Sequence, residues 1–264
     1  MFSRVTTAAF AAGLLVQPLA AEPPAPTVTK YRVTISAHSV VDLSAFGGGS
    51  QETTNIISGF FTITTADTTG GRTLHAVLDS MRLDSVSIGR DVMQSMADSA
   101  KGAAWHGLVT ANGNVQNLTA VTANAGARQF EGVLAAFYPR GAQGRKTGQT
   151  WTDTLSYTST SEQGTTTITS ITTYTAAGEA TQGGVKALKI TSTGTSTTTG
   201  MLNQPGGEAQ LDGTGTTVGT WYLTRDGLYL GGQNDGNNDM TVTMPTAPMP
   251  IAVKARTTVT VAKL

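Results

Sequence analysis

Apolar and polar side chains alternate along most of this chain, and this alternation constrains the fold more than any other feature. In YRVTISAH, for example, Tyr31, Val33 and Ile35 fall on one face, and the polar residues between them fall on the other. A period of two is that of a β-strand, whose successive side chains point to opposite faces of a sheet. The 47 threonines among 264 residues support this interpretation, because β-branched side chains favour strands. The sequence therefore predicts an all-β protein whose sheet has one face in water.

Glycine pairs mark turns between the predicted strands, and the same turns occur twice. Gly70-Gly71 is matched by Gly183-Gly184, and Asn112-Gly113 is matched by Asp226-Gly227, at offsets of 113 and 114 residues. Asn-Gly and Asp-Gly pairs favour tight hairpins, and two turns that match at one offset indicate an internal repeat. The alternative is that any threonine-rich β protein resembles itself at such hairpins.

This repeat predicts how the chain is organised. Residues 30–121 form a first β-meander, and residues 150–264 form a second meander followed by a C-terminal strand. Residues 122–149 supply a linking helix and loop, and the whole is one compact domain. The expected fold is dominated by a large curved antiparallel sheet, or a half-barrel or two-sheet arrangement, with one or two short helices.

Two segments leave the alternation and have helical patterns. GRDVMQSMADSAKG predicts a short helix in which Asp91 and Gln94 form a capping box. Residues 125–138 predict a second helix, which begins after Asn124 and ends before Pro139. The apolar side chains of this second helix form one stripe, made of Phe130, Val133, Leu134 and Phe137.

Three polar or irregular segments are expected to lie outside the strands. Residues 195–216 are polar and rich in glycine, which predicts a long mobile loop. Residues 233–240, QNDGNNDM, are rich in oxygen donors but lack the spacing of a calcium loop, so a hairpin loop is expected. Between residues 240 and 253, methionines alternate with prolines, which favours either a flexible apolar lip over a ligand or a crossover that covers the core.

The N-terminal segment predicts export. Residues 1–21 combine Arg4, a short apolar run and a small-residue cleavage site, as in a secretory signal peptide. A proline-rich linker is expected at residues 22–29, and the mature protein is expected in the periplasm or outside the cell. Retention of the segment as a membrane anchor is the alternative, although the apolar run is shorter than the ~20 residues of a span. The chain has no cysteine, so its stability cannot come from disulfides.

Composition and motifs exclude several kinds of function. Charged residues make up 13% of the chain, with 17 basic and 17 acidic, so no nucleic-acid partner is expected. No zinc-binding spacing, phosphate-binding loop, dinucleotide fingerprint or serine-hydrolase elbow is present, so no metal or cofactor is expected. A catalytic triad can be assembled from distant residues, so a hydrolase built around His38, His75 or His106 stays open. A glycosidase using acids such as Asp79 and Asp84 is disfavoured, because only three tryptophans are present.

The middle of the chain resembles a group of uncharacterised secreted bacterial β-rich proteins, a domain of unknown function. The resemblance rests on an amphipathic helix, an aromatic-proline stop and a basic-Gly-x-x-Trp entry to the next strand. It implies an architecture similar to the curved-sheet carriers of the bacterial envelope, which hold acyl chains or a protein partner on a concave apolar face. It implies no catalytic residue. The residues that carry it are Phe130, Leu134, Phe137, Pro139, Lys146, Gly148 and Trp151.

Together these observations predict a non-enzymatic periplasmic or secreted binding or scaffold protein that holds an apolar ligand on a concave sheet. Its expected partner is an apolar small molecule or an envelope protein, with no integral membrane span after signal cleavage. An alternative is an accessory subunit docked peripherally on a membrane complex of respiratory or photosynthetic type, and a second alternative is a hydrolase with an unrecognised site. The candidate residues for binding a ligand or partner are Phe130, Leu134, Phe137, Met240, Met244 and Met249.

Overall fold

The computed structural model describes residues 25–44, 47–87, 89–122, 124–161, 164–204, 207–244 and 249–264. Over these residues the chain forms 11 strands and three short helices, which confirms the predicted all-β fold class. The strands are β1 (Thr27–Asp42), β2 (Ser50–Thr68), β3 (Gly71–Val86), β4 (Ala104–Thr110), β5 (Val115–Thr122), β6 (Thr150–Ser161), β7 (Gly164–Gln182), β8 (Val185–Gln204), β9 (Gly207–Leu223), β10 (Tyr229–Thr243) and β11 (Ile251–Lys263). The helices are α1 (Arg90–Ala100), α2 (Ala125–Arg128) and α3 (Glu131–Ala135).

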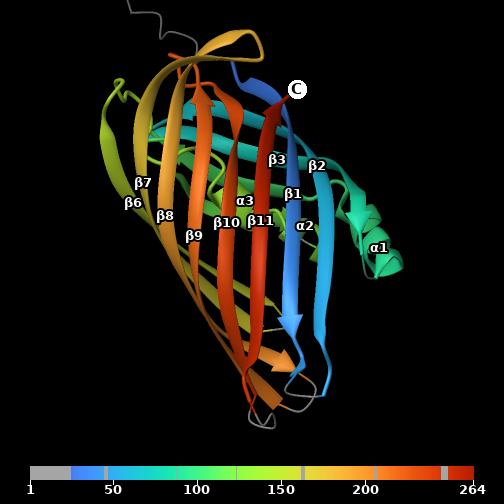
Figure 1. The fold of residues 1–264 in the computed structure, drawn as a ribbon. Coiled ribbons are helices and arrows are strands. Elements are labelled where there is room, and N and C mark those ends of the chain that lie inside the picture. The colour runs from blue at the N-terminus through green and yellow to red at the C-terminus, as the bar shows by residue number, and fades with distance from the viewer. Residues whose placement is uncertain are drawn as a thin grey trace, which may run out of the picture.

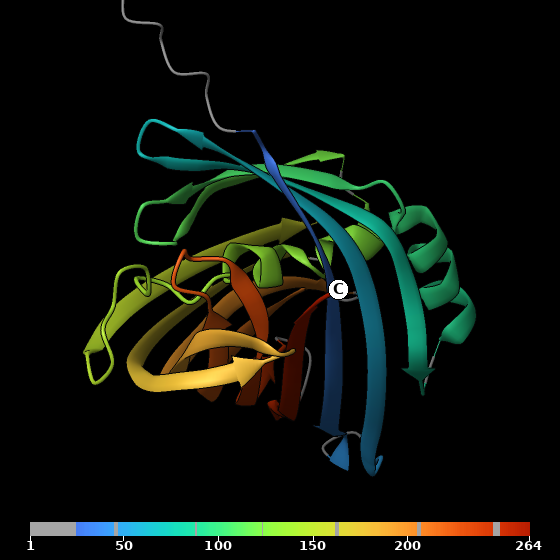
Figure 2. The ribbon, with the colours of Figure 1, turned by 90° about the horizontal axis from the view of Figure 1, so that it is seen from above.

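All the strands belong to one antiparallel sheet, in the order β5-β4-β3-β2-β1-β11-β10-β9-β8-β7-β6. Strands β1 to β5 form one meander and β6 to β10 form another, and β11 lies between β1 and β10 (Figure 1). The sheet curls into a half-barrel, and α2 and α3 lie inside its curve (Figure 2). Helix α1 packs against β3 and α2. Among the described residues, no helix combines the length and apolar character that crossing a membrane requires.

The predicted signal peptide, residues 1–21, lies outside the described residues. Strand β1 begins at Thr27, inside the segment predicted as a linker. Residues 27–29 are strand because they continue the ladder with β2, where Thr27 faces Thr65. The predicted buried face of β1 is confirmed, since Tyr31 and Val33 are buried and Ile35 packs against the same core.

Threonines cover the convex face of the second meander, where they face water in rows. Their hydroxyls pair across neighbouring strands: Thr152 and Thr173 are 3.1 Å apart, and Thr158 and Thr167 are 2.9 Å apart. Such cross-strand pairs stabilise a sheet face without apolar burial. The polar alternation of these strands therefore gives one wet face, as the sequence predicts.

On the concave side of β8, β9 and β10, glycines occupy many of the positions that lie opposite one another on neighbouring strands. A Cβ atom on Gly215 would lie 2.1 Å from the Asn238 side chain, and one on Gly219 would lie 2.1 Å from the Trp221 ring. Curling a sheet brings side chains together on its concave face, so positions without a side chain relieve the crowding there. The distribution of threonine outside and glycine inside is consistent with the direction in which the sheet curls.

Two predicted loops are strands, which corrects the sequence analysis. Residues predicted as a mobile loop, 195–216, belong to β8 up to Gln204 and to β9 from Gly207. QNDGNNDM lies within β10 and pairs with both β9 and β11. The prediction was wrong because it judged these segments by polarity alone, whereas hydrogen bonds to strands on both sides hold them extended.

The predicted helices are present with different details. Helix α1 begins after Gly89, which has a left-handed backbone (φ +69°), and Asp91 lies in its first turn instead of capping it. Gln94 donates to Asp98 and closes no capping box.

The second predicted helix, residues 125–138, is divided into α2 and α3. Asn124 caps α2 as predicted, because its side chain accepts a hydrogen bond from the Ala127 N–H at 2.9 Å. The break allows Phe130 to pack on β2 while Phe137 packs on β1 and β10.

Candidate functional site

A cavity of about 310 Å³ lies between α3 and the concave face of the second half of the sheet. Its walls come from α3, from the loop after it and from strands β6 to β11. Most of the large side chains on these walls are apolar or aromatic, as is typical of small-molecule sites. They include Phe137, Leu155, Ile168, Tyr174, Trp221 and Val259.

A row of aromatic rings supports one wall of this cavity. Trp151 stacks on Tyr174 with ring centroids 5.4 Å apart, and Tyr174 lies 5.7 Å from Trp221. Arg145 covers the outer end of the row, 4.8 Å from the Trp151 ring, and the Trp151 indole N–H donates to the Arg140 carbonyl at 2.7 Å. These contacts hold the Tyr174 and Trp221 rings in place at the cavity wall.

Arg140 and Asp153 are the charged residues among those that line the cavity, and uncharged polar residues line it too: Ser170, Thr172, Ser192, Thr217, Gln233 and Asn234. Arg140 and Asp153 form an ion pair in which both side chains are largely buried. Burial raises the pKa of Tyr174 to about 12, and the nearby Asp153 charge adds to the effect, so this phenol stays neutral at physiological pH. Ser192, 4% exposed, is different: its hydroxyl has no hydrogen-bond partner among the described residues. The cavity therefore presents no unbalanced charge to a ligand.

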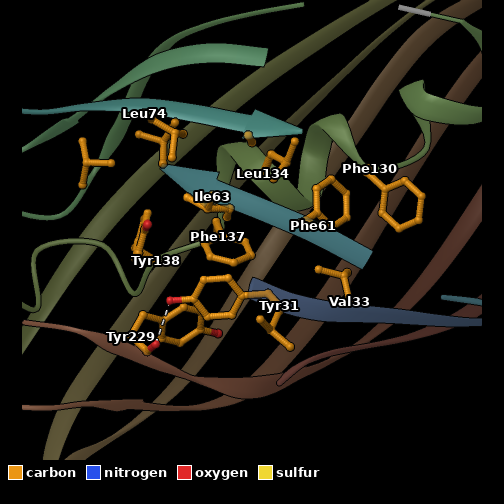
Figure 3. Close-up of a cluster of buried hydrophobic side chains, with 14 of the residues drawn as sticks. Tyr31, Val33, Phe61, Ile63, Leu74, Phe130, Leu134, Phe137, Tyr138 and Tyr229 are labelled. Atoms are coloured by element: carbon orange, nitrogen blue, oxygen red, sulfur yellow. Dashed lines mark hydrogen bonds between the residues drawn. The ribbon is translucent and has the colours of Figure 1, made fainter. Parts of the chain in front are cut away.

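Three residues of the predicted apolar stripe, Phe130, Leu134 and Phe137, are buried in the core (Figure 3), and Val133 packs partly buried against it. The Phe130 ring lies 5.2 Å from that of Phe61, and the Phe137 ring lies 5.1 Å from Tyr31 and 5.3 Å from Tyr229. Of the six residues predicted to bind a ligand or partner, Phe137 is the one that also borders the cavity. Phe130 and Leu134 attach the helices to the sheet.

The predicted methionines lie at the connection between β10 and β11, apart from this cavity. Met240 is half-buried on β10 beside Gly213, Met244 follows the end of β10, and Met249 is exposed just before β11. Residues 245–248 of the same segment lie outside the described residues. The strands on either side of the segment, β10 and β11, pair with each other as far as Val242 and Ile251.

The motif that carries the family resemblance forms the turn into β6. The Lys146 N–H donates to the Gln149 side chain at 2.8 Å, and the Gly148 N–H donates to the Ala176 carbonyl at 2.8 Å. Gly148 has a φ of +86°, which a glycine adopts without strain. These residues therefore position Trp151 at the start of its strand.

The histidines lie away from the cavity. His38 Nε2 is 3.1 Å from Glu52 Oε1, and His38 Nδ1 is 3.1 Å from Thr54 Oγ1. The rings of His75 and His106 face each other across β3 and β4, with centroids 4.5 Å apart. The His38 and Glu52 side chains are 42% and 68% exposed, so water surrounds this acid–histidine–hydroxyl group. Catalytic electrostatics depend on an enclosed, water-excluded site. The hydrolase alternative stays a prediction.

The acidic residues considered in the sequence are occupied by local hydrogen bonds. Asp79 accepts from the Thr62 hydroxyl at 2.7 Å. Asp84 accepts from the Ser58 hydroxyl at 2.6 Å, and this bond lowers the pKa of Asp84. Within the described part of the chain, no group of three or more histidine or acidic side chains could hold a metal ion.

Sequence reasoning did not single out most of the cavity residues. Ile168 and Tyr174 lie in a threonine-rich strand, and Trp221 follows a segment rich in glycine and threonine. A usable signal was present, since Ile168 and Tyr174 share one phase of the alternation in TTTITSITTYT. That phase predicts a shared face, but only the curvature shows that this face is concave.

No family model and no curated protein matches the chain. Among solved structures, a lipovitellin structure described for lipid–protein interactions is similar over 91% of this chain, at 11% identity and a TM-score of 0.44. The chain spans 25% of that lipovitellin chain. OmpT, an outer membrane protein of Vibrio cholerae, and its loop L8 deletion mutant are similar over 91% and 90% of this chain and the whole of theirs. Their identities are 9% and 8%, with TM-scores of 0.22 and 0.24.

Proposed function

We propose that this protein binds a small, neutral, mainly apolar ligand in the cavity between α3 and the concave sheet. The cavity itself is the observation that carries the proposal. Its volume of about 310 Å³ falls within the ~300–1,000 Å³ usual for small-molecule sites. Binding would remove the aromatic and aliphatic side chains of the walls, and the apolar surface of the ligand, from contact with water, which lowers the free energy.

The charges of the cavity favour a neutral ligand. Arg140 and Asp153 neutralise each other, and the Tyr174 phenol is uncharged. A ligand ion would lose hydration on entry and would have to break this pair to gain a partner, which is costly. Ser192 supplies a buried hydroxyl that has no partner among the described residues, in addition to the other uncharged polar side chains of the wall.

The proposal includes no chemical step, and so describes a carrier or sensor and not an enzyme. Export by residues 1–21 and a periplasmic or secreted location belong to the same proposal. Peripheral docking on a membrane complex stays the alternative from sequence.

Two isoleucines of β7 provide a matched test of the proposal. Ile168 borders the cavity and is 42% exposed, whereas Ile171 is 53% exposed and points to the convex face. Ile168→Asp places a carboxylate at the cavity, so we expect it to weaken binding of the neutral fluorophore N-phenyl-naphthylamine by about tenfold. Ile171→Asp makes the same chemical change outside the cavity, and we expect less than about a twofold effect, within the usual range for surface substitutions.

Fluorescence titration measures both affinities, and thermal unfolding checks that both variants are folded. Failure of the unaltered protein to bind the fluorophore would refute the proposal. Equal weakening by the two substitutions would also refute it, since binding would then not involve the cavity.

A further inference from the structure

A second, polar pocket of about 210 Å³ lies on the other side of Tyr229 from the apolar cavity. Strands β1, β2 and β3 supply part of its wall, and the hairpin turn between β9 and β10 supplies another part. Tyr229 borders both spaces. The argument for this pocket does not depend on the function proposed above.

Arg72 interrupts an apolar stripe at this pocket. Leu78, Ala76 and Leu74 are buried on the concave face of β3, and Arg72 occupies the next position in the same phase. Arg72 is half-buried, and its side chain forms no hydrogen bond or ion pair with the residues that the structure describes. A guanidinium has five N–H donors, and none of those of Arg72 has an acceptor in the described part of the chain.

The charge of Arg72 lowers the pKa values of other groups on the pocket wall. A hydrogen bond from Thr224 lowers the pKa of Asp226, and the Arg72 charge lowers it further. Burial raises the pKa of Tyr138 to about 12, and Arg72 offsets part of that rise. These effects are consistent with a guanidinium that faces the pocket.

Tyr138 supplies a second donor without a partner. Its side chain is 8% exposed and packs against Phe137 and Tyr229, with ring centroids 5.1 and 5.7 Å away (Figure 3). The neighbouring Tyr31 hydroxyl donates to the Tyr229 carbonyl at 2.8 Å, but the Tyr138 hydroxyl has no hydrogen bond to any described residue. A phenol O–H is a hydrogen-bond donor, so a polar group that enters the pocket would give it an acceptor.

We infer that this pocket binds the carboxylate group of a small organic acid, with Arg72 and Tyr138 as the donors. A guanidinium matches a carboxylate with two parallel hydrogen bonds, and a phenol can donate to a remaining lone pair. Thr29 and Thr65 also line the pocket. Asp226 is exposed at the turn and adds a negative charge to the wall. A monoanion is therefore favoured over doubly charged phosphate, which Asp226 repels more strongly.

Amide NMR titration of the full chain tests this inference, with Gly227 and Leu228 of the pocket wall as reporters. The probes are butyrate, its uncharged analogue butyramide, and inorganic phosphate at matched ionic strength. We expect butyrate to bind at least about tenfold more tightly than butyramide, because the hydrogen bonds to Arg72 are charge-assisted. Phosphate should bind more weakly than butyrate.

Three substitutions distinguish specific binding at this pocket from a general attraction of anions to positive charge. Arg72→Gln should weaken butyrate binding by about tenfold or more, and Tyr138→Phe, which keeps the ring, should weaken it about threefold or more. Arg225→Gln is the matched control, because Arg225 is exposed beside Asp226 and is not part of the pocket wall. It removes the same charge from the turn that contains Asp226 and should change the affinity by less than about twofold.

Several results would overturn the inference. These are equal binding of butyrate and butyramide, tighter binding of phosphate than of butyrate, or equal losses in Arg72→Gln and Arg225→Gln. The fluorophore assay reports the apolar cavity separately, so either site can fail without the other.

Discussion

The contact between Gly59 and Phe130 shows how one missing side chain positions the helices on the sheet. Gly59 lies on β2, and the Phe130 ring covers it from the loop before α3. A Cβ atom on Gly59 would lie 2.7 Å from Phe130 Cζ and 2.8 Å from Phe61 Cε2. Real Cβ atoms do not approach this closely, so the ring packs here only because residue 59 is glycine.

Replacing either residue should destabilise the protein, and the two effects should not add. We expect Gly59→Ala to lower the free energy of unfolding by about 1–3 kcal/mol through overpacking. Phe130→Ala should lower it by about 3–5 kcal/mol through the cavity it leaves. In the double variant the new methyl group occupies space that the ring vacates, so the loss should be smaller than the sum. Urea unfolding measures all three values, and strict additivity would contradict the contact.

At the scale of elements, α2 and α3 are too short to be stable alone and depend on their neighbours. Helix α2 is four residues long, and α1 packs directly against it. A Cβ atom on Gly126 of α2 would lie 2.3 Å from the Met96 carbonyl oxygen of α1. Gly132 of α3 has no atom within 4 Å of the equivalent position. The two glycines therefore have different physical roles although both are helical.

The same substitution at these two glycines should have opposite effects. Gly126→Ala forces α1 and α2 apart, and we expect a loss of about 1–3 kcal/mol in the free energy of unfolding. Gly132→Ala gains helix propensity without a clash, and we expect a gain of up to about 1 kcal/mol. Thermal and urea unfolding of both variants measure the difference. A stabilising Gly126→Ala would mean that α1 does not pack on α2 as described.

At the scale of the whole molecule, β11 joins the two meanders. It pairs with β1 from Tyr31 to Val41 and with β10 from Gly231 to Val242. The Leu264 N–H donates to the Lys30 carbonyl at 2.9 Å, so the end of β11 lies beside the beginning of β1. The two meanders are therefore joined by the pairing of β1 with β11, between residues more than 200 positions apart in the chain.

This arrangement predicts that the described part of the chain tolerates circular permutation at a hairpin. A linker of about six glycine and serine residues from Leu264 to Thr27 is long enough, since an extended residue spans about 3.3 Å. Opening the chain between Gly183 and Gly184 should leave the circular dichroism spectrum unchanged, because permutation is tolerated at exposed turns. Opening it between Asp235 and Gly236 cuts β10 and should prevent cooperative thermal unfolding. If both permutants fold equally well, β10 is not a central strand.

Local patterns in the sequence determined much of the secondary structure. The alternation showed which residues share a face of β1, and the glycine pairs marked the turns between β2 and β3 and between β9 and β10. Asn124 was recognised as a helix cap because capping depends on residues three positions apart. These features depend on interactions between near neighbours, which the order of residues contains directly.

The tertiary structure alone decided where the two pockets lie. A period of two shows that Ile168 and Tyr174 share a face, but the concave side follows from how the whole sheet curls. In the sequence, nothing distinguishes Arg72 from other strand residues. It lines a pocket only because the turn that contains Asp226, which belongs to another part of the sheet, lies at the same pocket. The polarity of residues 195–216 predicts a loop, but pairing with the neighbouring strands makes them part of β8 and β9. Each of these outcomes depends on pairings between segments that are distant in the chain. The free energy of such pairings comes from the whole sheet, so no short segment of the sequence determines it.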